Sequence, residues 1–321
     1  MNQSLLGKDS SFSSQLKAYR EQYRQFCRER SDLPLYLDPY WLDTVCGDDG
    51  WSAAIAVDRS GQLNFALPFQ WSYRYRLFRF LHTPLFTPYV GPLLVKDQDK
   101  RPVHAFLHGY QDMVQQAMMP WQRVRFIRWK LHYTLPHDLP FRWQGMHNKP
   151  RATFLIRPGH TPEEHFARLD KNIQRDIRQA QRKYRIVEVT DREAFTSLAI
   201  GHLEERRVGN LAVYRQAMMN ILHEYQGSGR LKAWLTTDEQ GKIMAGALFV
   251  ADADSVYYLA AFRDTRISNN QGNSLLVWQG IEWALKDDLI FDFEGSNIPG
   301  VASYFRRFGA EQIQCIEVYR P

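Results

Sequence analysis

Cysteine and long hydrophobic runs are both scarce in this sequence of 321 residues. Its cysteines, Cys27, Cys46 and Cys315, are far apart, which indicates a reducing compartment rather than a disulfide-stabilised secreted protein. No His or Cys residues have zinc-site spacing, so we expect no metal. Prolines interrupt the most apolar stretch, near residues 78–95, and the first residues lack a signal-peptide pattern. We therefore predict a cytoplasmic protein without a membrane span.

Aromatic side chains and positive charge are, in contrast, abundant. Phe, Tyr and Trp make up 14% of the residues and hydrophobic residues 44%, which supports packed cores and excludes a disordered chain. The chain is long for a single core, so we expect two domains, residues 1–150 and residues 151–321. The net charge of +6 favours an anionic partner such as nucleic acid, a phosphorylated substrate or a membrane surface.

Residues 1–150 contain the patterns of an α/β domain. Residues 51–58 and 62–75 read as two strands, and the short turn between them predicts a hairpin. Asp38 followed by Pro39 indicates the start of a helix. The segment 82–94 is rich in proline and aromatic residues. It is either a buried connection or one wall of a cleft.

The most regular pattern of the chain lies in residues 161–186, which we expect to form one helix. Thr161 and Glu164 have the spacing of a capping box. Apolar residues recur every three or four positions on one side, and basic residues, including Arg175 and Arg178, recur on the opposite side. This basic face is either a solvated helix surface or a ridge that contacts phosphate groups. The sequence leaves both interpretations open.

The next residues predict two helices and an antiparallel meander. The helices fall within residues 193–225, and three strands follow in residues 231–262. Glu204 and Glu205 are candidates for a general base, although pairing with neighbouring arginines on the helix surface is the simpler interpretation. His202 has no partner at metal-ligand spacing, so we assign it a structural role.

The segment with the strongest chemical pattern is residues 289–310. Residues 289–294 alternate as a strand, Gly295 ends that strand, and a short helix ending at Gly309 follows. Asp292 and Glu294 therefore lie at the end of a strand, and Arg306 lies on the helix after it. From spacing alone, these acids are a solvated edge that pairs with the arginines.

Three motifs resemble those of the FemABX-like transferases, which belong to the GNAT (N-acetyltransferase) superfamily. The run D-F-E-G-S…F-R-R-F-G, residues 292–309, is similar to the family motif D-F-x-G…F-K-x-x-F-G, with Arg306 in place of the lysine and one residue fewer before Phe308. Residues 84–92 resemble the family loop P-L-x-x-x-Y-x-G-P. Residues 171–180 resemble its K-x-R-x-x-I-R-x-A helix.

The resemblance implies an α/β (α+β) fold of two tandem GNAT-like domains, each a mixed, mostly antiparallel sheet flanked by helices. It implies transfer of an acyl or aminoacyl group from an activated ester, aminoacyl-tRNA in the family, to an amine of an anionic acceptor such as a cell-wall precursor. Arg306 would then stabilise the oxyanion, Asp292 or Glu294 would accept the amine proton, and Tyr304 would orient them. The residues expected to contact substrate are Arg175, Arg178, Tyr89, Tyr258, Arg207 and Ser296.

The cofactor prediction depends on the loop before residue 272. Acetyltransferases have R/Q-x-x-G-x-G/A there, whose amides hold the pyrophosphate of coenzyme A. Aligned on Gly272, this chain has Asn269 at the first position and Ser274 at the last, so only one glycine remains. We expect no tightly bound cofactor. The alternatives are an N-acyltransferase that uses a coenzyme A or carrier-protein thioester, and a non-catalytic module that binds RNA or another polyanion.

Overall fold

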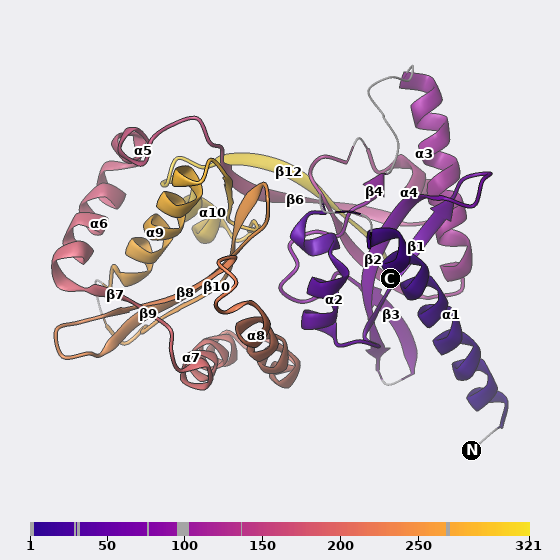
Figure 1. Cartoon of the computed structure of the whole chain (residues 1–321), viewed down its shortest axis with the longest axis horizontal. Coiled ribbons are helices and arrows are strands. Elements are labelled where there is room, and N and C mark those ends of the chain that lie inside the picture. Colours follow the sequence, from indigo (N-terminus) through magenta and orange to yellow (C-terminus); the bar gives the residue numbers. More distant parts are fainter. Residues whose placement is uncertain are drawn as a thin grey trace. The chain divides into compact units, whose positions relative to one another are not determined.

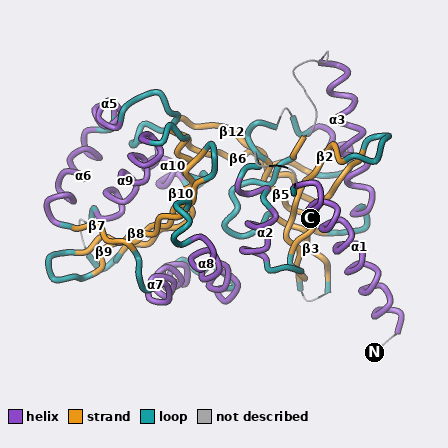
Figure 2. The backbone as a smooth tube through the Cα atoms, viewed as in Figure 1, coloured by secondary structure: helices purple, strands orange, loops and turns teal. Residues whose placement is uncertain are grey.

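A computed structural model describes residues 3–28, 30, 33–75, 77–94, 103–135, 137–267 and 270–321 (Figures 1 and 2). The chain divides into two compact units. Unit 1 comprises Met1–Pro150 and Cys315–Pro321, and unit 2 comprises Arg151–Gln314. The expected second domain extends to residue 321, whereas the last residues of the chain belong to unit 1, because Ile316–Arg320 pair with a strand of that unit.

Unit 1 combines a mixed set of strands with several helices. Its strands are β1 (Trp51–Val57), β2 (Leu63–Arg74), β3 (Phe78–His82), β4 (Leu93–Leu94), β5 (Phe126–Leu131) and most of β12 (Glu311–Arg320). Its helices are α1 (Gln3–Cys27), α2 (Pro39–Cys46), α3 (Val103–Met118) and α4 (Leu139–Trp143), with 3-10 turns at Leu35–Leu37 and Met119–Trp121. These lists cover the described residues.

The sheet of unit 1 is mixed, with the strand order β1-β2-β3-β5-β12 and with β4 paired to β2. β1 and β2 form the predicted antiparallel hairpin, in which Trp51 lies opposite Gln70. The predicted helix start is also confirmed, because the Asp38 side chain accepts a hydrogen bond from the Tyr40 amide. β3 and β5 run parallel, and α3 lies in the connection between them. Helices α1 and α3 pack against β1.

The proline-rich segment 82–94 is a buried connection in unit 1. After β3 ends, its backbone continues along β5: the Thr83 amide donates to Arg128 O at 3.0 Å and the Val90 amide donates to Lys130 O at 2.8 Å. The Tyr89 side chain is 1% exposed and packs edge-on against the rings of Tyr36 and His132. The segment therefore fills the space beside β5.

Unit 2 contains the longer run of antiparallel strands. Its strands are most of β6 (His147–Ile156), then β7 (Arg185–Glu188), β8 (Leu231–Thr237), β9 (Ile243–Ala251), β10 (Ser255–Arg263) and β11 (Ile290–Asp292). Its helices are α5 (Pro162–Arg168), α6 (Lys171–Lys183), α7 (Arg192–Glu205), α8 (Leu211–Tyr225), α9 (Gly272–Lys286) and α10 (Pro299–Arg306). Both lists refer to the part of the chain that the structure describes.

The sheet of unit 2 has the strand order β6-β11-β10-β9-β8-β7. β8, β9 and β10 form the predicted antiparallel meander, while β10 and β11 are parallel and are connected through α9. Helices α6 and α9 cover one face of this sheet, and α7 and α8 cover the other (Figure 1). The apolar stripe of α6, formed by Ile173, Ile177 and Ala180, is buried in the core cluster that contains α9.

The single helix expected over residues 161–186 is in fact two helices, α5 and α6. The predicted capping box of Thr161 and Glu164 starts α5. Leu169 then adopts an extended backbone, and Asp170 caps α6 by accepting hydrogen bonds from the amides of Asn172 and Ile173. The Asp170 amide itself donates to the carbonyl oxygen of Arg307 at 3.0 Å, so a distant segment fixes the break.

The described helices of both units are too short or too polar to cross a membrane.

Candidate active site

The candidate active site lies where the parallel strands of unit 2 separate. β10 and β11 pair from Ser255 opposite Ile290 to Tyr257 opposite Asp292. β11 then ends, whereas β10 continues to Arg263 beside β9, with an irregular register between Tyr258 and Ala260. Tyr258 lies at this irregularity, and its hydroxyl group reaches the start of α9.

Two tyrosine hydroxyl groups meet the first turn of α9 at this point. Tyr258 Oη donates to Asn273 Oδ1 at 3.0 Å, and Asn273 Nδ2 donates to Tyr304 Oη at 3.3 Å. Tyr304 Oη also lies 3.1 Å from Ser274 Oγ. This hydroxyl network, formed by Tyr258, Asn273, Ser274 and Tyr304, thus joins β10, α9 and α10.

Both tyrosines of the hydroxyl network remain protonated at neutral pH. Burial raises the pKa of Tyr304 to about 12, even though its hydrogen bonds to Ser274 and Asn273 favour the phenolate. Burial, together with the proximity of Tyr304, also raises the pKa of Tyr258 far above its ordinary value. The network can therefore donate protons or hydrogen bonds but does not supply a negative charge.

The carboxylate of Asp292 is buried at the end of β11, with 1% of the residue exposed. It accepts hydrogen bonds from Thr153 Oγ1 at 2.7 Å and from the Glu294 amide at 2.8 Å. Glu294 and Gly295 then turn the chain with positive φ angles of 58° and 77°. A Cβ atom on Gly295 would come within 2.1 Å of Ala152 O, so the turn requires glycine there. Asp292 therefore shapes this turn rather than forming a solvated edge.

Arg306 lies at the end of α10 with its side chain exposed. Its Nη1 donates to Gln312 Oε1 at 3.4 Å, and within the described residues it forms no ion pair with Asp292 or Glu294. The structure therefore does not bring together the three charged groups that the sequence analysis assigns to catalysis. Of the four residues predicted to be catalytic, only Tyr304 joins the hydroxyl network.

Arg307, the second arginine of the motif, has a structural partner instead. Its Nη2 lies 3.1 Å from Asp170 Oδ1. Although desolvation raises the pKa of Asp170, the hydrogen bonds from Arg307 and from the amides of Asn172 and Ile173 lower it below the ordinary value. This pair connects the end of α10 to the start of α6.

The basic face of α6 is exposed and lies apart from the hydroxyl network. The Arg175 side chain is 62% exposed, with Nη2 3.7 Å from Asp176. The Arg178 guanidinium lies 5.2 Å from the centre of the Phe166 ring. These two arginines thus keep most of their surface in solvent, which both interpretations of the face allow.

The other residues predicted to contact substrate are dispersed. Arg207 is exposed with a φ of 57°, directly after α7. Ser296 Oγ accepts a hydrogen bond from the Ile298 amide at 3.1 Å, which supports the turn before α10. Tyr89 belongs to the core of unit 1. Tyr258 is the one substrate-contact candidate that lies in the hydroxyl network.

A pocket of about 560 Å³ opens beside the end of β10. The end of α7 supplies His202, Glu204 and Glu205, and residues 262–266 supply Arg263 and charged groups after it. His202 Nδ1 is buried, has no hydrogen-bond partner and lies 3.8 Å from Glu205 Oε2. Burial, followed by the charge of Arg206, lowers the pKa of His202 below 6.5. The imidazole is therefore neutral at neutral pH.

Two arginines link this pocket electrostatically to the hydroxyl network. The charge of Arg206 affects both His202 and Tyr258, and the charge of Arg263 affects both His202 and Tyr304. The sequence analysis identifies the two glutamates but treats His202 as structural, because nothing local shows that the end of α7 meets the end of β10. Within the described residues, no group of three or more His, Cys, Asp or Glu side chains could hold a metal ion.

The start of α9 differs from a loop that presents several free amides. The Gly272 amide donates to Asn270 Oδ1 at 3.0 Å, and a Cβ atom on Gly272 would come within 2.4 Å of Thr236 Oγ1. Gly272 therefore permits close packing on β8. The Ser274 hydroxyl faces Tyr304, and Asn269 lies outside the described residues.

Comparison with known families agrees with this architecture. Residues 167–306 match the family model described as an acetyltransferase (GNAT) domain. The match lies within unit 2, which therefore contains an acetyltransferase domain of the GNAT type. A comparison with curated protein sequences finds no match.

The fold as a whole is similar to that of FemX. The two share a TM-score of 0.62 at 12% sequence identity, over 92% of this chain and 95% of FemX. L-PGS from Bacillus licheniformis has a TM-score of 0.52 at 11% identity, over 94% of this chain and 91% of that chain. A conserved protein of unknown function from Bacteroides thetaiotaomicron has a TM-score of 0.55 at 11% identity, over 94% and 96% of the two chains. The expected α/β fold of tandem GNAT-like domains is confirmed.

Proposed function

We propose that unit 2 transfers an acyl or aminoacyl group from an activated ester to an amine. The observation that carries this proposal is the hydroxyl network at the point where β11 ends beside β10. In the reaction, the amine nitrogen attacks the ester carbonyl carbon and the C–N bond forms. The C–O bond then breaks, the amine loses a proton, and the leaving oxygen gains one.

Tyr304 is the residue that we assign to the leaving oxygen. Its pKa of about 12 keeps the proton on the phenol at neutral pH, and the hydrogen bond from Asn273 fixes its orientation. A positioned phenol can stabilise the oxyanion and can protonate the alcohol as it leaves. Tyr258 acts through Asn273 as a positioning residue, because its hydroxyl holds that amide.

The pocket beside β10 suits an acceptor that carries both an amine and an anionic group. Glu204 and Glu205 provide negative charge for a substrate ammonium group, and Arg263 provides positive charge for a carboxylate or phosphate. The neutral imidazole of His202 has a free nitrogen that can accept the amine proton. We therefore propose His202 as the base, in place of Asp292, which is buried in other hydrogen bonds.

We propose aminoacyl-tRNA as the donor and an anionic, nucleotide-linked precursor of the cell wall as an acceptor. The net charge of +6 and the exposed arginines of α6 favour a polyanionic partner. The Gly272 amide already bonds to Asn270, which leaves the start of α9 less suited to a pyrophosphate than a glycine-rich loop. We accordingly propose that no cofactor is tightly bound.

A coenzyme A or carrier-protein thioester is the second candidate donor. The match of residues 167–306 to an acetyltransferase domain supports it, because the same attack by an amine would release a thiol instead of an alcohol. Tyr304 would then protonate a thiolate.

Thermal unfolding with acetyl-coenzyme A or tRNA distinguishes the donors. A ligand of the folded state, at about a hundredfold its Kd, stabilises it by about 2.7 kcal/mol. Stabilisation by tRNA, followed by transfer of a labelled amino acid from aminoacyl-tRNA to an amine, would support the first donor. Stabilisation and turnover with acetyl-coenzyme A alone would support the second. Stabilisation by tRNA without turnover on any donor would instead indicate a binding module and contradict the proposal.

A further inference from the structure

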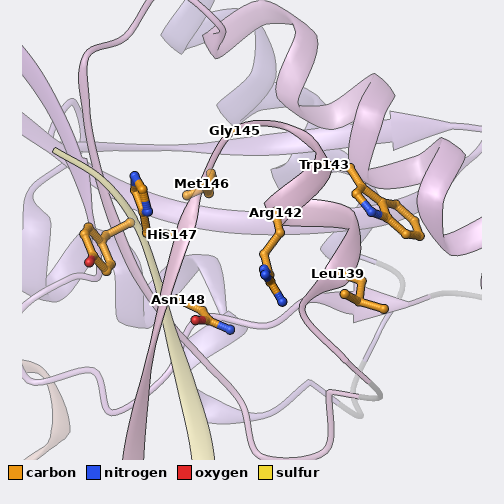
Figure 3. A pocket seen from close by; sticks show the side chains of 8 residues that line it. Leu139, Arg142, Trp143, Gly145, Met146, His147 and Asn148 are labelled. Carbon is orange, nitrogen blue, oxygen red and sulfur yellow. The ribbon is translucent and has the colours of Figure 1, made fainter.

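Unit 1 contains a pocket of about 500 Å³ between α4 and the start of β6. In Figure 3, Leu139, Arg142 and Trp143 lie on one side of it, and His147 and Asn148 lie on the other. Met146, which is 4% exposed, forms part of its floor. The whole pocket belongs to unit 1, so it is distinct from the acyltransfer site proposed for unit 2.

The charged side chains at this pocket have no acidic partners. Neither the Arg142 guanidinium nor the neighbouring Lys149 ammonium forms an ion pair or a side-chain hydrogen bond within the described part of the chain. Elsewhere in unit 1, by contrast, Arg20 pairs with Asp49 at 2.8 Å and Arg24 pairs with Asp43 at 2.5 Å. Of these two cations, Arg142 lines the pocket, so its guanidinium is available to a ligand there.

Aromatic surface is available at the same place. Trp143 is 57% exposed and contacts no other aromatic ring among the described residues. Across the pocket, the rings of His147 and Tyr319 stack with centres 5.4 Å apart and an interplanar angle of 29°. An indole left in water at a concave site favours binding of another flat ring, because stacking removes apolar surface from water.

The one amide that lines the pocket has a fixed orientation. Asn148 Nδ2 donates to Asp138 Oδ2 at 2.6 Å, so its carbonyl oxygen remains as an acceptor that faces away from that carboxylate. The Asp138 carboxylate is thereby engaged, and residues 142–151 contain no acidic residue. The pocket thus combines the Arg142 guanidinium, the exposed Trp143 indole and one hydrogen-bond acceptor.

We propose that this pocket binds a nucleotide, with its base stacked on Trp143 and its phosphate held by Arg142. Interleaved aromatic and cationic side chains are the recurring feature of sites for unpaired nucleotides, because every base has a flat face and every linkage has a negative charge. The Asn148 carbonyl oxygen would accept a hydrogen bond from an exocyclic amino group of the base. The nucleotide comes either from a single RNA strand or from a free nucleotide.

Fluorescence anisotropy of a labelled eight-nucleotide single-stranded RNA tests this site on the full chain. Trp143→Ala should weaken binding about tenfold, whereas Trp143→Phe should keep most of the affinity because phenylalanine still stacks. Arg142→Gln should weaken binding severalfold and reduce its salt dependence. Arg59→Gln, the same change of charge in the β1–β2 turn, should bind like the wild type. Because Trp143 is exposed, the variants should fold normally, which circular dichroism checks.

Competition then identifies the source of the nucleotide. Displacement of the RNA by CMP or AMP at comparable nucleotide concentrations indicates a free nucleotide as the ligand. Displacement by unlabelled single strands alone, with duplex RNA ineffective, indicates an RNA strand. Equal affinity of wild type and Trp143→Ala, or no binding of any probe, would overturn the proposal. Because only binding is measured, a failure of the proposed transfer reaction would not affect the result.

Discussion

The two units contain the same local arrangement with different outcomes. Each has one pair of parallel strands joined through a helix, β3–α3–β5 in unit 1 and β10–α9–β11 in unit 2. In unit 1, the backbone of residues 83–91 continues along β5 after the parallel pairing ends. In unit 2, β11 ends at Asp292, and the hydroxyl network lies beside the remaining length of β10. In unit 1, the backbone of the chain therefore fills the space beside the parallel strands. In unit 2, polar side chains lie at that place.

The two units also differ in the surroundings of Tyr89 and Tyr304. Tyr89 of unit 1 packs edge-on against Tyr36 and His132 and is 1% exposed. Tyr304 of unit 2 has its hydroxyl group within hydrogen-bond distance of Asn273 and Ser274. Tyr89 thus packs in a core, whereas the Tyr304 hydroxyl belongs to the network to which we assign the proposed chemistry.

Removing the Tyr304 hydroxyl should have the largest effect on activity. Tyr304→Phe keeps the ring but removes the proton donor, so we expect kcat to fall by about 100-fold or more. Tyr257→Phe is the matched control, since that hydroxyl donates to Asp252, outside the network. Steady-state transfer kinetics measure the effect. Equal losses in the two variants would mean that Tyr304 has no special role.

Tyr89→Ala should lower the stability of the protein but not its kcat. Removing a buried aromatic ring leaves a cavity, and we expect the free energy of unfolding to fall by about 3–5 kcal/mol. The kcat of the protein that remains folded should not change, because the ring lies in unit 1. Urea denaturation measures the free energy of unfolding, and kinetics normalised to the concentration of active sites measure kcat. A large loss of kcat with unchanged stability would contradict the division of roles between the units.

The charge of His202 should produce a smaller, pH-dependent effect on the acceptor. Its pKa lies below 6.5, so protonation adds a positive charge beside Arg206 and Arg263 only at acidic pH. That charge repels a substrate ammonium group and also removes the free base. We expect KM for the amine to rise about threefold as the pH falls through this pKa, and kcat to fall as the free base is lost. His202→Gln should abolish this rise, and an unaltered profile in the variant would exclude His202 from the site.

The pair of Asp170 and Arg307 should give the smallest effect, a change in stability with pH. The pKa of Asp170 is lowered in the folded state, so the pair contributes stability above the unfolded pKa of about 3.9 and loses it as pH falls through the folded value. Asp170→Asn keeps a capping oxygen but removes the charge. Chemical unfolding should show wild type and variant converging at acidic pH. A constant difference at every pH would argue against the ion pair.

Local patterns were sufficient to predict most individual elements. The β1–β2 hairpin, the meander of β8 to β10 and the capping box at Thr161 all depend on residues close together in the chain, and all are present. The motif at residues 292–309 also carries the resemblance to the FemABX-like transferases, and the GNAT domain match and the fold shared with FemX agree with it. The sequence analysis names Tyr258 and Tyr304 as candidates, but no local pattern predicts that Asn273 connects them.

The sequence does not predict contacts between residues that are far apart in the chain. The break between α5 and α6 depends on Arg307, whose carbonyl oxygen accepts from the Asp170 amide, and no local signal identifies that partner. The burial of Asp292 depends on Thr153, 139 residues earlier in the chain. The pocket at His202 forms only because the end of α7 meets the end of β10. The motif likewise predicts a catalytic Arg306, whereas the side chain of Arg306 extends toward Gln312.

Hydrogen exchange with and without a non-hydrolysable aminoacyl-tRNA analogue tests most directly whether the donor group is held in unit 2. The account predicts slower exchange of backbone amides in residues 258–276 and 299–308, with no change in residues 83–94 of unit 1. Protection of residues 83–94, with the first turn of α9 and α10 unaffected, would contradict it.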